Sequence, residues 1–386
     1  MNKTSHIYYS ANSLPKGWNA FVKHDIFLQV DYLKALEEAS PDNIQLFYIG
    51  VFKEDLLVGV AIIQRVQLYL KDMFRKTQVS CLKEFFQNII SKILKGNILV
   101  VGNLTHTGQH ALFFDENRMT QSDFFNFIFK GLDTLRIKIK ETQGKKIRAV
   151  MLKDFFLEDS IHKDKTAFND HKLHEVFVQP NMIMPTRLNW LKFEDYIADL
   201  NKKYRNRYKR AKKKFGAIKC MELDLEAVQA NTQKLHHLYL NVSNNAKFNT
   251  FILPEKHFYI LKQKLNENFR IFGYYLDDKL VGFYTLILNG KNLETYFLGY
   301  DKEHQYPNQL YQNMLYDMVK FGIENKFSSV VYARTAMEIK SSVGARPKAM
   351  LVYLKHTNKF LNAILKAIFG LMNPTQDWEE RHPFKN

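Results

Sequence analysis

The chain has 386 residues, 46% of them apolar, which is enough for two domains or one large one and is ordinary for a globular protein. Its formal charge of +17 favours a polyanionic partner, such as nucleic acid, anionic lipid headgroups or the phosphates of coenzyme A, although a lysine-rich composition alone produces a similar excess. The sequence has no apolar run of about 18 residues, so no membrane-spanning helix is expected. It has no apolar region near its N-terminus, so no signal peptide is expected. Cys81 and Cys220 have no metal-binding or redox spacing, so we expect reduced thiols, no metal and a cytoplasmic protein.

The first half of the chain alternates helical and strand patterns, as expected for an α/β unit. Apolar residues at three-residue steps predict its first helix, and alternating residues on either side of a Lys-Glu-Asp turn predict a β-hairpin. The expected elements are helix 25–39, strands 45–52 and 57–64, helix 82–94, strand 97–101, helix 120–141 and strand 146–155.

The second half repeats this order. Two helices lead into a hairpin and a third strand, and another helix, a buried strand and a short helix follow. A last strand and a last helix complete the pattern, with Asn373-Pro374 ending the helix. The expected elements are helices 225–243 and 254–265, strands 270–275, 280–288 and 292–300, helix 307–325, strand 328–332, strand 349–354 and helix 358–372.

A constant offset relates the hairpins of the two halves. The sequence IGVFKED at 49–55, followed by LVG at 57–59, matches FGYYLDD and LVG in 272–282, with an offset of 223 (272 − 49) throughout. The flanking elements match in order as well, so a chance likeness between two turns does not explain the repeat. We therefore expect an α/β fold with two copies of one unit, joined near 185–192, and domains spanning 1–190 and 191–386.

The stretch 331–345, VYARTAMEIKSSVGA, follows the buried strand and carries most of the candidate site residues. Thr335 is a favourable N-cap, Glu338 has the capping-box spacing three residues later, and the following Gly can end a short helix. The strand then delivers Arg334 and Lys340 to a helix N-terminus, which can hold an anion. Two plainer interpretations stay open: a structural capping box with an exposed Lys340, and a salt bridge between Arg334 and Glu338.

The sequence ARTAMEIKSSVGARP in this stretch resembles the motif of the FemAB-like, or BioF2-like, branch of the GNAT acyltransferase superfamily. The segments KKYRNRYKRAKKKFG, FILPEKHF and YPNQLYQNMLYDMVKFGIENKFSSV fit the same family pattern. The resemblance covers residues 193–354 well and the first half of the chain weakly. It implies two tandem GNAT-like domains, each with a mixed central sheet flanked by helices, and transfer of an acyl group from a thioester to an amine.

One segment departs from the pattern of ordinary GNAT acetyltransferases, whose pyrophosphate loop is glycine-rich. The corresponding segment here, DKEHQYPN at 301–308, has no glycine, which weighs against simple acetyl-CoA binding. Some FemAB-like proteins use aminoacyl-tRNA as donor, and those that build peptidoglycan bridges often carry a long coiled-coil insertion, for which we find no heptad pair here. Asn308 and Tyr311 are expected to contact substrate.

The strand 292–300 corresponds to the GNAT strand whose backbone N–H holds the acyl carbonyl, and we expect three catalytic residues around it. Glu294 can accept a proton from the amine, Tyr296 can donate one, and Lys340 adds a charge that a carboxylate or phosphate needs. The alternative is that Glu294 and Tyr296, which alternate onto one face with Leu298, are ordinary polar strand residues. The residues expected to bind substrate on the neighbouring stretch are Arg334, Thr335 and Glu338.

A loop in the first half contributes one more candidate. His106 and His110 flank Gly108 after the strand 97–101. Histidine titrates near neutrality and can act as a base, so His110 is expected to contact substrate. The alternative is that a loop His has no role in function, which is the more common case.

The segment 202–214 places nine Lys and Arg in thirteen residues, with Tyr204 and Tyr208 as one apolar stripe. Such a helix can follow a tRNA backbone or lie on an anionic membrane, and the alternative is a solvated basic face. The apolar faces of helices 82–94 and 358–372 can likewise dock on a membrane or pack on the protein's own core. The residues expected to bind a polyanion are Arg205, Arg207, Lys209 and Arg210.

These features favour an N-acyltransferase. The donor is acyl-CoA or acyl carrier protein, with no permanently bound cofactor, and the acceptor amine belongs to an aminolipid or a cell-envelope precursor. Peripheral contact with the inner face of an anionic membrane is the further partner expected, and tRNA is less favoured. Two alternatives stay open: an aminoacyl-tRNA-dependent transferase acting on a peptidoglycan precursor, and a non-enzymatic nucleic-acid-binding protein on a degenerate GNAT scaffold. Lys340→Ala should impair an enzyme, whereas a binding protein should depend on the basic helix.

Overall fold

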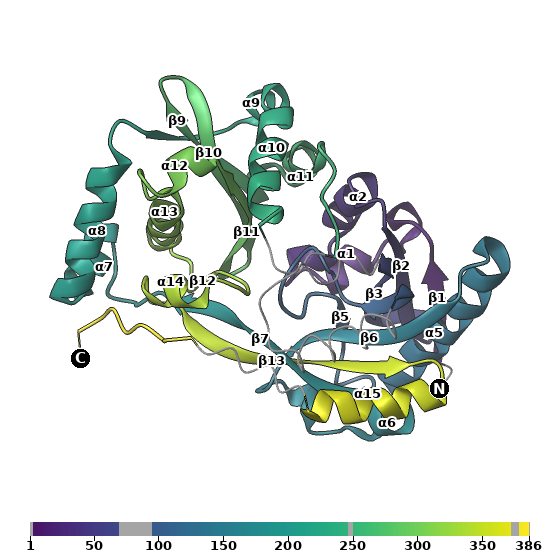
Figure 1. Ribbon diagram of the computed structural model, residues 1–386. Helices are drawn as coiled ribbons and strands as arrows, with labels where there is room; N and C mark the ends of the chain where they lie inside the picture. Colours follow the sequence, from purple (N-terminus) through teal and green to yellow (C-terminus); the bar gives the residue numbers. More distant parts are fainter. Residues whose placement is uncertain (1–2, 69–94, 246–249, 372–377, 386) are drawn as a thin grey trace. The chain divides into compact units, whose positions relative to one another are not determined.

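The computed structural model describes residues 3–68, 95–245, 250–371 and 378–385, so the helix expected over 82–94 lies outside the described residues. Two compact units are present (Figure 1): Met1–Gln179 with Lys247–Leu253 and Ala349–Thr375, and Pro180–Ala246 with Pro254–Lys348 and Gln376–Asn386. We call them the first and the second unit. The predicted domains, 1–190 and 191–386, are continuous, whereas the two units interleave along the chain. The reason is that the chain leaves the first unit within one strand, His174–Pro185, and belongs to it again at Lys247–Leu253 and from within another strand, Arg346–His356.

A mixed sheet forms the first unit. Its strands are β1 (Lys3–Tyr8), β2 (Ile44–Lys53), β3 (Leu56–Leu68), β4 (Gly96–Val101), β5 (Leu112–Phe114), β6 (Ile147–Phe156) and β13 (Arg346–His356). The order is β1-β2-β3-β4-β6-β13, with β5 added to β3, and β4 and β6 are the parallel pair. The helices are α1 (Trp18–Phe21), α2 (Val30–Glu38), α5 (Gln121–Gln143), α6 (Thr166–Asp170) and α15 (Lys359–Leu371). The apolar face of α5 is buried against the sheet in a core that includes Phe125, Ile128 and Ile49.

The second unit has the same plan. Its strands are β7 (His174–Pro185), β8 (Lys219–Glu222), β9 (Phe269–Leu276), β10 (Lys279–Asn289), β11 (Asn292–Tyr300) and β12 (Ser329–Val331), in the order β7-β12-β11-β10-β9-β8. The strands β11 and β12 are the parallel pair. The helices are α7 (Phe193–Asp199), α8 (Lys202–Phe215), α9 (Leu225–Ala230), α10 (Thr232–Ser243), α11 (His257–Leu265), α12 (Lys302–Gln305), α13 (Leu310–Glu324) and α14 (Met337–Ser341).

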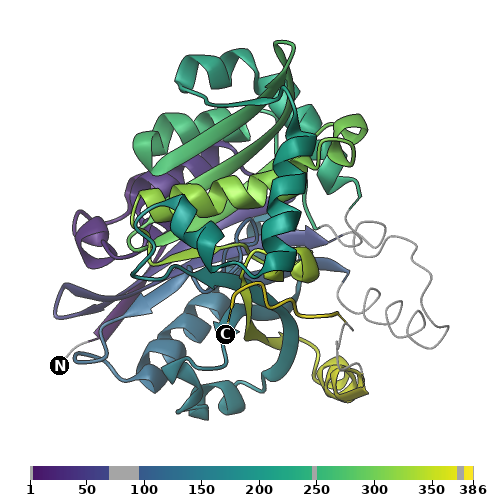
Figure 2. The same ribbon diagram turned by 90° about the vertical axis from the view of Figure 1, so that its left-hand side faces the viewer.

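Helices cover both faces of the sheet in the second unit. In Figure 1, α7, α8 and α13 lie on one side of β9–β11, and α9, α10 and α11 lie on the other. Figure 2 looks onto α8 where it crosses α13. At one point no side chain separates helix from sheet, because a Cβ on Gly299 of β11 would lie 2.4 Å from the backbone of Leu238 in α10. This close packing holds β11 against α10.

The repeated hairpin is confirmed in its turn and in its bulge. Glu54 and Asp55 have φ of 51° and 65°, and Asp277 and Asp278, 223 positions later, have φ of 48° and 60°. Two successive left-handed residues make the tight turn whose twist suits a two-residue hairpin, and aspartate tolerates that conformation. The strand register also shifts at equivalent places, across residue 58 in β3 and across residue 281 in β10. The two halves are therefore a structural repeat.

Two predicted helices are interrupted. The helix expected over 225–243 is divided into α9 and α10 at Asn231, whose side chain donates to the carbonyl of Ala227 (2.8 Å). The helix expected over 25–39 is a short 3₁₀ turn, Ile26–Leu28, followed by α2, because Gln29 is extended with a ψ of 148°. Within the part of the chain that the structure describes, no helix combines the length and the apolarity needed to cross a membrane.

Candidate functional site

The parallel pairing of β11 with β12 stops part of the way along β11. Asn292, Leu293 and Glu294 pair with the three residues of β12, which ends at Val331. β11 itself runs on to Tyr300, and its pairing with β10 on the other edge continues to that residue. Strand pairing at the β12 edge therefore ends at Glu294 among the described strands, and β11 and β12 part at this point.

A β-bulge changes the direction of the side chains just beyond this point. The Thr285 hydroxyl donates to the carbonyl of Phe297 (2.7 Å) and accepts from its N–H (3.0 Å), so two residues of β11 face one of β10. The predicted alternation of Tyr296 and Leu298 onto one face is therefore interrupted. The Tyr296 hydroxyl lies 3.0 Å from Nε2 of the buried His257 in α11, whereas Leu298 packs against the core cluster that contains α13. The bulge brings Tyr296 next to a histidine that sequence reasoning did not select.

Lys340 holds the loop that follows β12. Its ammonium donates to three consecutive carbonyls, from Tyr332 to Arg334, at 2.5, 3.2 and 2.6 Å. Ala333, Thr335 and Ala336 in this loop have φ of 59°, 66° and 46°, a conformation that costs free energy for residues other than glycine. Burial lowers the pKa of Lys340 to about 7, while the three carbonyls favour its charged form. These contacts hold the chain where β12 leaves β11, and they favour a positioning role for Lys340.

The predicted capping box at Thr335 and Glu338 does not form. α14 begins after Ala336, which is left-handed, and no side chain caps it. Thr335 is exposed with a φ of 66°, whereas a capping residue needs extended backbone. The Glu338 carboxylate pairs with Arg381, which the capping-box interpretation did not foresee. The predicted capping box is therefore wrong, whereas binding of an anion or substrate at this helix start remains a prediction.

Arg334 precedes that helix in the same loop. It is partly buried, and burial lowers the pKa of its guanidinium to about 10. Three of the predicted substrate-binding residues, Arg334, Thr335 and Glu338, thus lie together with Lys340 in one loop and one short helix after β12. Their contact with substrate remains a prediction.

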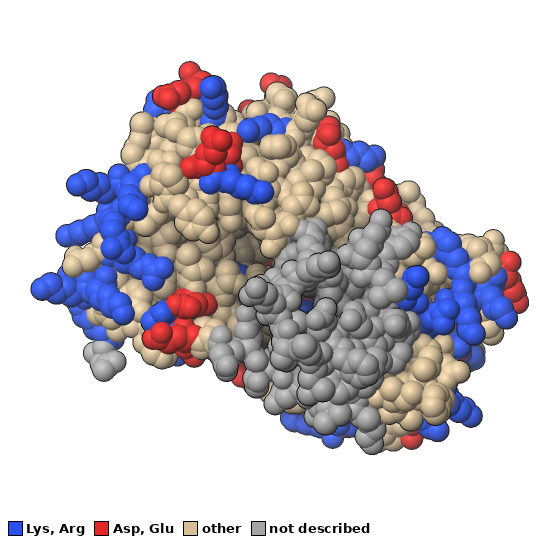
Figure 3. Space-filling model, viewed as in Figure 1, with Lys and Arg blue, Asp and Glu red and all other residues tan. Residues whose placement is uncertain are grey.

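A pocket of about 330 Å³ lies in the second unit, lined by residues of α8, the start of α13 and α14. Lys203, Arg207 and Arg210 line it from one face of α8, at positions i, i+4 and i+7. Ile339 of α14 closes another side. Figure 3 shows Lys and Arg gathered over α8 as a continuous basic column. Two of the predicted polyanion-binding residues thus share a pocket with Lys203, which sequence reasoning did not single out.

The other two predicted polyanion-binding residues lie elsewhere on α8. Lys209 is exposed and is not part of the pocket lining. The Arg205 guanidinium donates to the carbonyl of Leu200 (2.8 Å), just before the helix begins. The basic helix therefore has one face aimed into a pocket and another in solvent.

Gln312 is a buried polar side chain in the lining of this pocket. It is 5% exposed, and within the described residues neither of its amide atoms has a hydrogen-bond partner of good geometry. Tyr316 lies one turn further along α13, and burial raises its pKa to about 12 against the opposing effects of Arg207 and Gln312. An unsatisfied buried amide is costly, so a ligand that brings an oxygen atom into the pocket satisfies Gln312 and meets three cations.

Asn308 and Tyr311 connect the glycine-free segment to its surroundings. The Asn308 side chain donates to the carbonyl of Lys214 in α8 (3.1 Å), and the Tyr311 N–H donates to the Gln305 side chain (3.0 Å). The ring of Tyr311 lies 6.5 Å from that of Tyr300, at the end of β11, and burial raises its pKa. The segment between β11 and α13 is thus tied to α8, which also lines the pocket.

At the position of the first unit that is equivalent to the parting of β11 and β12, the two described parallel strands stay close together. β4 and β6 pair in parallel up to Val101 and Leu152, where β4 ends, so β4 has no stretch that continues past its partner. A Cβ on the next residue, Gly102, would lie 2.7 Å from the Cβ of Lys153, which shows how closely the chains continue to pack. The equivalent strands in the two units therefore end in different ways.

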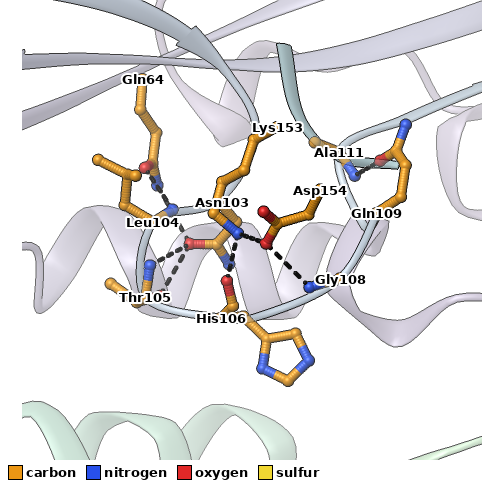
Figure 4. Close-up of polar contacts among 10 residues, drawn as sticks. All are labelled: Gln64, Asn103, Leu104, Thr105, His106, Gly108, Gln109, Ala111, Lys153 and Asp154. Atoms are coloured by element: carbon orange, nitrogen blue, oxygen red, sulfur yellow. Dashed lines mark hydrogen bonds and ion pairs between the residues drawn. The ribbon is translucent and has the colours of Figure 1, made fainter. Parts of the chain in front are cut away.

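Figure 4 shows a loop, residues 103–111, wrapped around the Lys153 and Asp154 side chains of β6. The Lys153 ammonium contacts the Asp154 carboxylate and donates to the carbonyl of His106 (2.7 Å), and the Gly108 N–H donates to Asp154 (3.1 Å). Asp154 has a φ of 63° and is fully buried. Removing either partner of a buried ion pair leaves an uncompensated charge, so these contacts keep the loop closed.

His110 forms an acid–base pair with Asp25 in the first unit. Its Nδ1 lies 2.8 Å from an Asp25 carboxylate oxygen. Burial raises the pKa of Asp25, but the pairing with His110, the hydrogen bond from the Phe27 N–H and the nearby His106 together outweigh it, so the net pKa is lowered. Phe27 stacks on the ring of His106 with centroids 4.0 Å apart and lies 4.6 Å from that of His110. The role of His110 in substrate binding remains a prediction.

His106 should make the protein sensitive to acid. Burial, and then His110 and Lys153, lower its pKa well below the usual value, so it stays neutral in the folded protein while the unfolded chain becomes protonated near pH 6.5. The unfolded state then binds more protons below that pH, so the free energy of unfolding falls, by about 1–2 kcal/mol between pH 6.5 and 5. We expect His106→Gln to lose this extra decrease in urea unfolding at the two pH values. The exposed His24→Gln should keep it, and an unchanged pH dependence in His106→Gln would contradict the assignment.

Comparisons with known proteins agree with this geometry. Residues 202–341 match the model of the acetyltransferase (GNAT) domain, whereas no curated protein matches the sequence. The crystal structure of FemX is 12% identical with a TM-score of 0.54, over 95% of this chain and 100% of that chain. A tandem GNAT protein from the clavulanic acid biosynthesis pathway is 8% identical with a TM-score of 0.51, over 92% of this chain and 99% of that chain. At these identities the two structures establish the fold.

The matched domain coincides with the part of the chain that carries the site. It begins at the start of α8 and ends with α14, so it includes the parting strands, the basic pocket and Lys340. The matched family consists of acyltransferases, for which acyl-CoA is a donor substrate. Residues 202–341 of the chain therefore carry a GNAT domain, and the chain as a whole is similar in fold to FemX and to a tandem GNAT protein.

Proposed function

We propose that the second unit is an N-acyltransferase that moves an acyl group from a thioester donor to an amine. The observation that carries the proposal is the parting of β11 and β12 after Glu294. A strand edge that leaves its partner presents backbone N–H groups that can hold an acyl carbonyl and stabilise its developing negative charge. The edge is held in place by the close packing of Gly299 on α10 and by Lys340 beneath the next loop.

Each bond change in this reaction has a group to support it. The amine nitrogen attacks the thioester carbonyl, a C–N bond forms, and the C–S bond breaks. Glu294, which is 2% exposed and sits where the strands part, takes the proton that the amine loses. Tyr296, next to His257, supplies a proton to the departing thiolate. Lys340 keeps the geometry of the opening by holding the backbone of the loop.

The basic pocket supports a donor that carries phosphate. Lys203, Arg207, Arg210 and Gln312 offer three cations and an amide to phosphate oxygens. In this proposal side chains of α8 bind the donor phosphates, which the backbone N–H groups of a glycine-rich loop bind in ordinary GNAT acetyltransferases. Coenzyme A and the phosphopantetheine of acyl carrier protein both have such phosphates, and we favour them as donors. The proposed acceptor is an amine of an aminolipid or a cell-envelope precursor.

Aminoacyl-tRNA is the second candidate donor. Exposed cations outside the pocket, such as Lys209 and Lys213, can follow a nucleic-acid backbone. A transferase of this kind would act on a peptidoglycan precursor. The non-enzymatic alternative, a nucleic-acid-binding protein on a GNAT scaffold, needs the same helix but not Glu294, so the two experiments below separate the three possibilities.

The first experiment tests the proton acceptor. Glu294→Gln keeps the shape of the side chain but cannot accept the proton, so we expect turnover to fall by about 10²–10⁴-fold in an acyl-transfer assay with acyl-CoA and amine acceptors. Glu303→Gln, an exposed carboxylate of the same unit, is the control and should keep full activity. Full turnover by a folded Glu294→Gln protein would rule out this role.

The second experiment tests the donor pocket with two double variants of one helix. Arg207→Gln with Arg210→Gln removes two charges that line the pocket, so we expect KM for acyl-CoA to rise at least about tenfold, since each charge-assisted contact contributes about 1.5–3 kcal/mol. Lys209→Gln with Lys213→Gln removes the same charge outside the pocket and should change KM less than about twofold. Equal losses in the two variants would favour a tRNA-like donor that contacts the whole helix.

A further inference from the structure

The first unit carries a basic surface of its own, separate in the chain from the helix α8. Two pockets of about 580 and 780 Å³ adjoin there and share Arg136, His356 and Thr357. They are lined by residues of α5, the start of β6, the end of β13 and the start of α15. Six of the lining cations define what we call the basic face: Arg136, Lys140, Lys146, Arg148, Lys355 and Lys359.

The charge of this face is strongly one-sided. Among the described residues that line the two pockets, Asp133 is the sole carboxylate, and it is paired with Arg136 at 2.6 Å. Lys140, Lys146, Arg148 and Lys359 are exposed to solvent. Like charges gathered at one site repel each other, so a face of this kind is stabilised when it meets an anionic partner.

Two large apolar side chains are exposed beside these cations. Ile137 of α5 is 60% exposed and lines the larger pocket, and Phe360 of α15 is 74% exposed. Ile137 follows Arg136 and Phe360 follows Lys359 in the chain. Surfaces that combine exposed cations with apolar side chains are typical of proteins that bind the interface of an anionic membrane.

The first turn of α15 is held so that it presents Phe360 outward. The Asn358 side chain accepts from the N–H groups of Phe360 and Leu361 (3.0 and 3.1 Å), which caps the helix. The Asn362 side chain accepts from the His356 N–H (2.7 Å) and donates to the carbonyl of Lys172 (3.0 Å). Leu365 of the predicted apolar face is fully buried in the protein's own core, whereas Phe360, which lies outside that predicted face, is exposed.

We propose that the first unit docks on an anionic phospholipid membrane through the basic face together with Ile137 and Phe360. The cations and pockets receive headgroup phosphates, and the two apolar side chains enter the boundary between headgroups and acyl chains. An aliphatic side chain such as Ile137 gains nothing from a phosphate backbone in water, which favours lipid over nucleic acid. The docking surface does not depend on the proposed acyl transfer, because none of its residues belongs to the second unit.

Vesicle sedimentation tests the charge. The protein should bind vesicles of phosphatidylglycerol and phosphatidylcholine but not of phosphatidylcholine alone, with affinity that falls as salt rises. Replacing Lys140, Lys146, Arg148 and Lys359 by Gln should reduce the binding at least tenfold. The control replaces four exposed lysines of the second unit outside α8, Lys219, Lys256, Lys279 and Lys291, by Gln, and should bind as the unaltered protein does. Equal binding by both variants, or equal loss in both, would overturn the proposal.

A second variant tests the apolar part and distinguishes lipid from RNA. The double variant Ile137→Ser with Phe360→Ser keeps every charge. We expect its affinity for vesicles at high salt to be at least fivefold lower than that of the unaltered protein. Thermal unfolding by circular dichroism checks that each variant is folded. Unchanged vesicle binding by the variant with the two serines would contradict membrane docking. So would a basic-face variant that binds a short RNA more weakly but binds vesicles as well as the unaltered protein.

Discussion

The site depends on one constraint, which is that two parallel strands pair over only three residues and then part. Pairing between β11 and β12 ends at Glu294, where β12 itself ends, while β11 runs on to Tyr300. The bulge opposite Thr285 twists β11. Gly299 has no side chain, so α10 packs directly on the backbone of β11. Lys340 holds the loop after β12 through hydrogen bonds to its carbonyls. Several contacts thus hold an arrangement that a regular sheet would close.

The first unit shows what happens when this constraint is absent. It has the same strand order, the same turn and the same bulge in its hairpin, yet β4 stops where its pairing with β6 stops. The Lys153–Asp154 ion pair and the loop around it fill the place where the second unit has parting strands. One fold repeated in one chain therefore provides an opening in the second unit, while the proposed membrane contact uses helices and strand ends of the first.

The elements and the repeat were predictable because local sequence determines them, whereas the site depends on contacts between distant residues. Asp55 and the pair Asp277-Asp278 tolerate the left-handed conformation of the two hairpin turns, so the turns follow from local sequence. The capping box at Thr335 failed because the loop that Lys340 holds puts Thr335 in a left-handed conformation, which overrides its preference as a cap. Asp25 and His110 are 85 positions apart, and Gln312 lies among apolar positions of α13, so no pattern in the sequence signalled either.

The most direct test of this account is hydrogen exchange of the backbone amides with and without acetyl-CoA. The central claim is that the donor binds where β11 and β12 part, next to the pocket lined by α8. Peptides that cover 295–300 and 305–312 should then exchange more slowly when acetyl-CoA is present, and peptides that cover the loop 103–111 should not change. Protection confined to the first unit, or protection of α8 without any at 295–300, would contradict the claim.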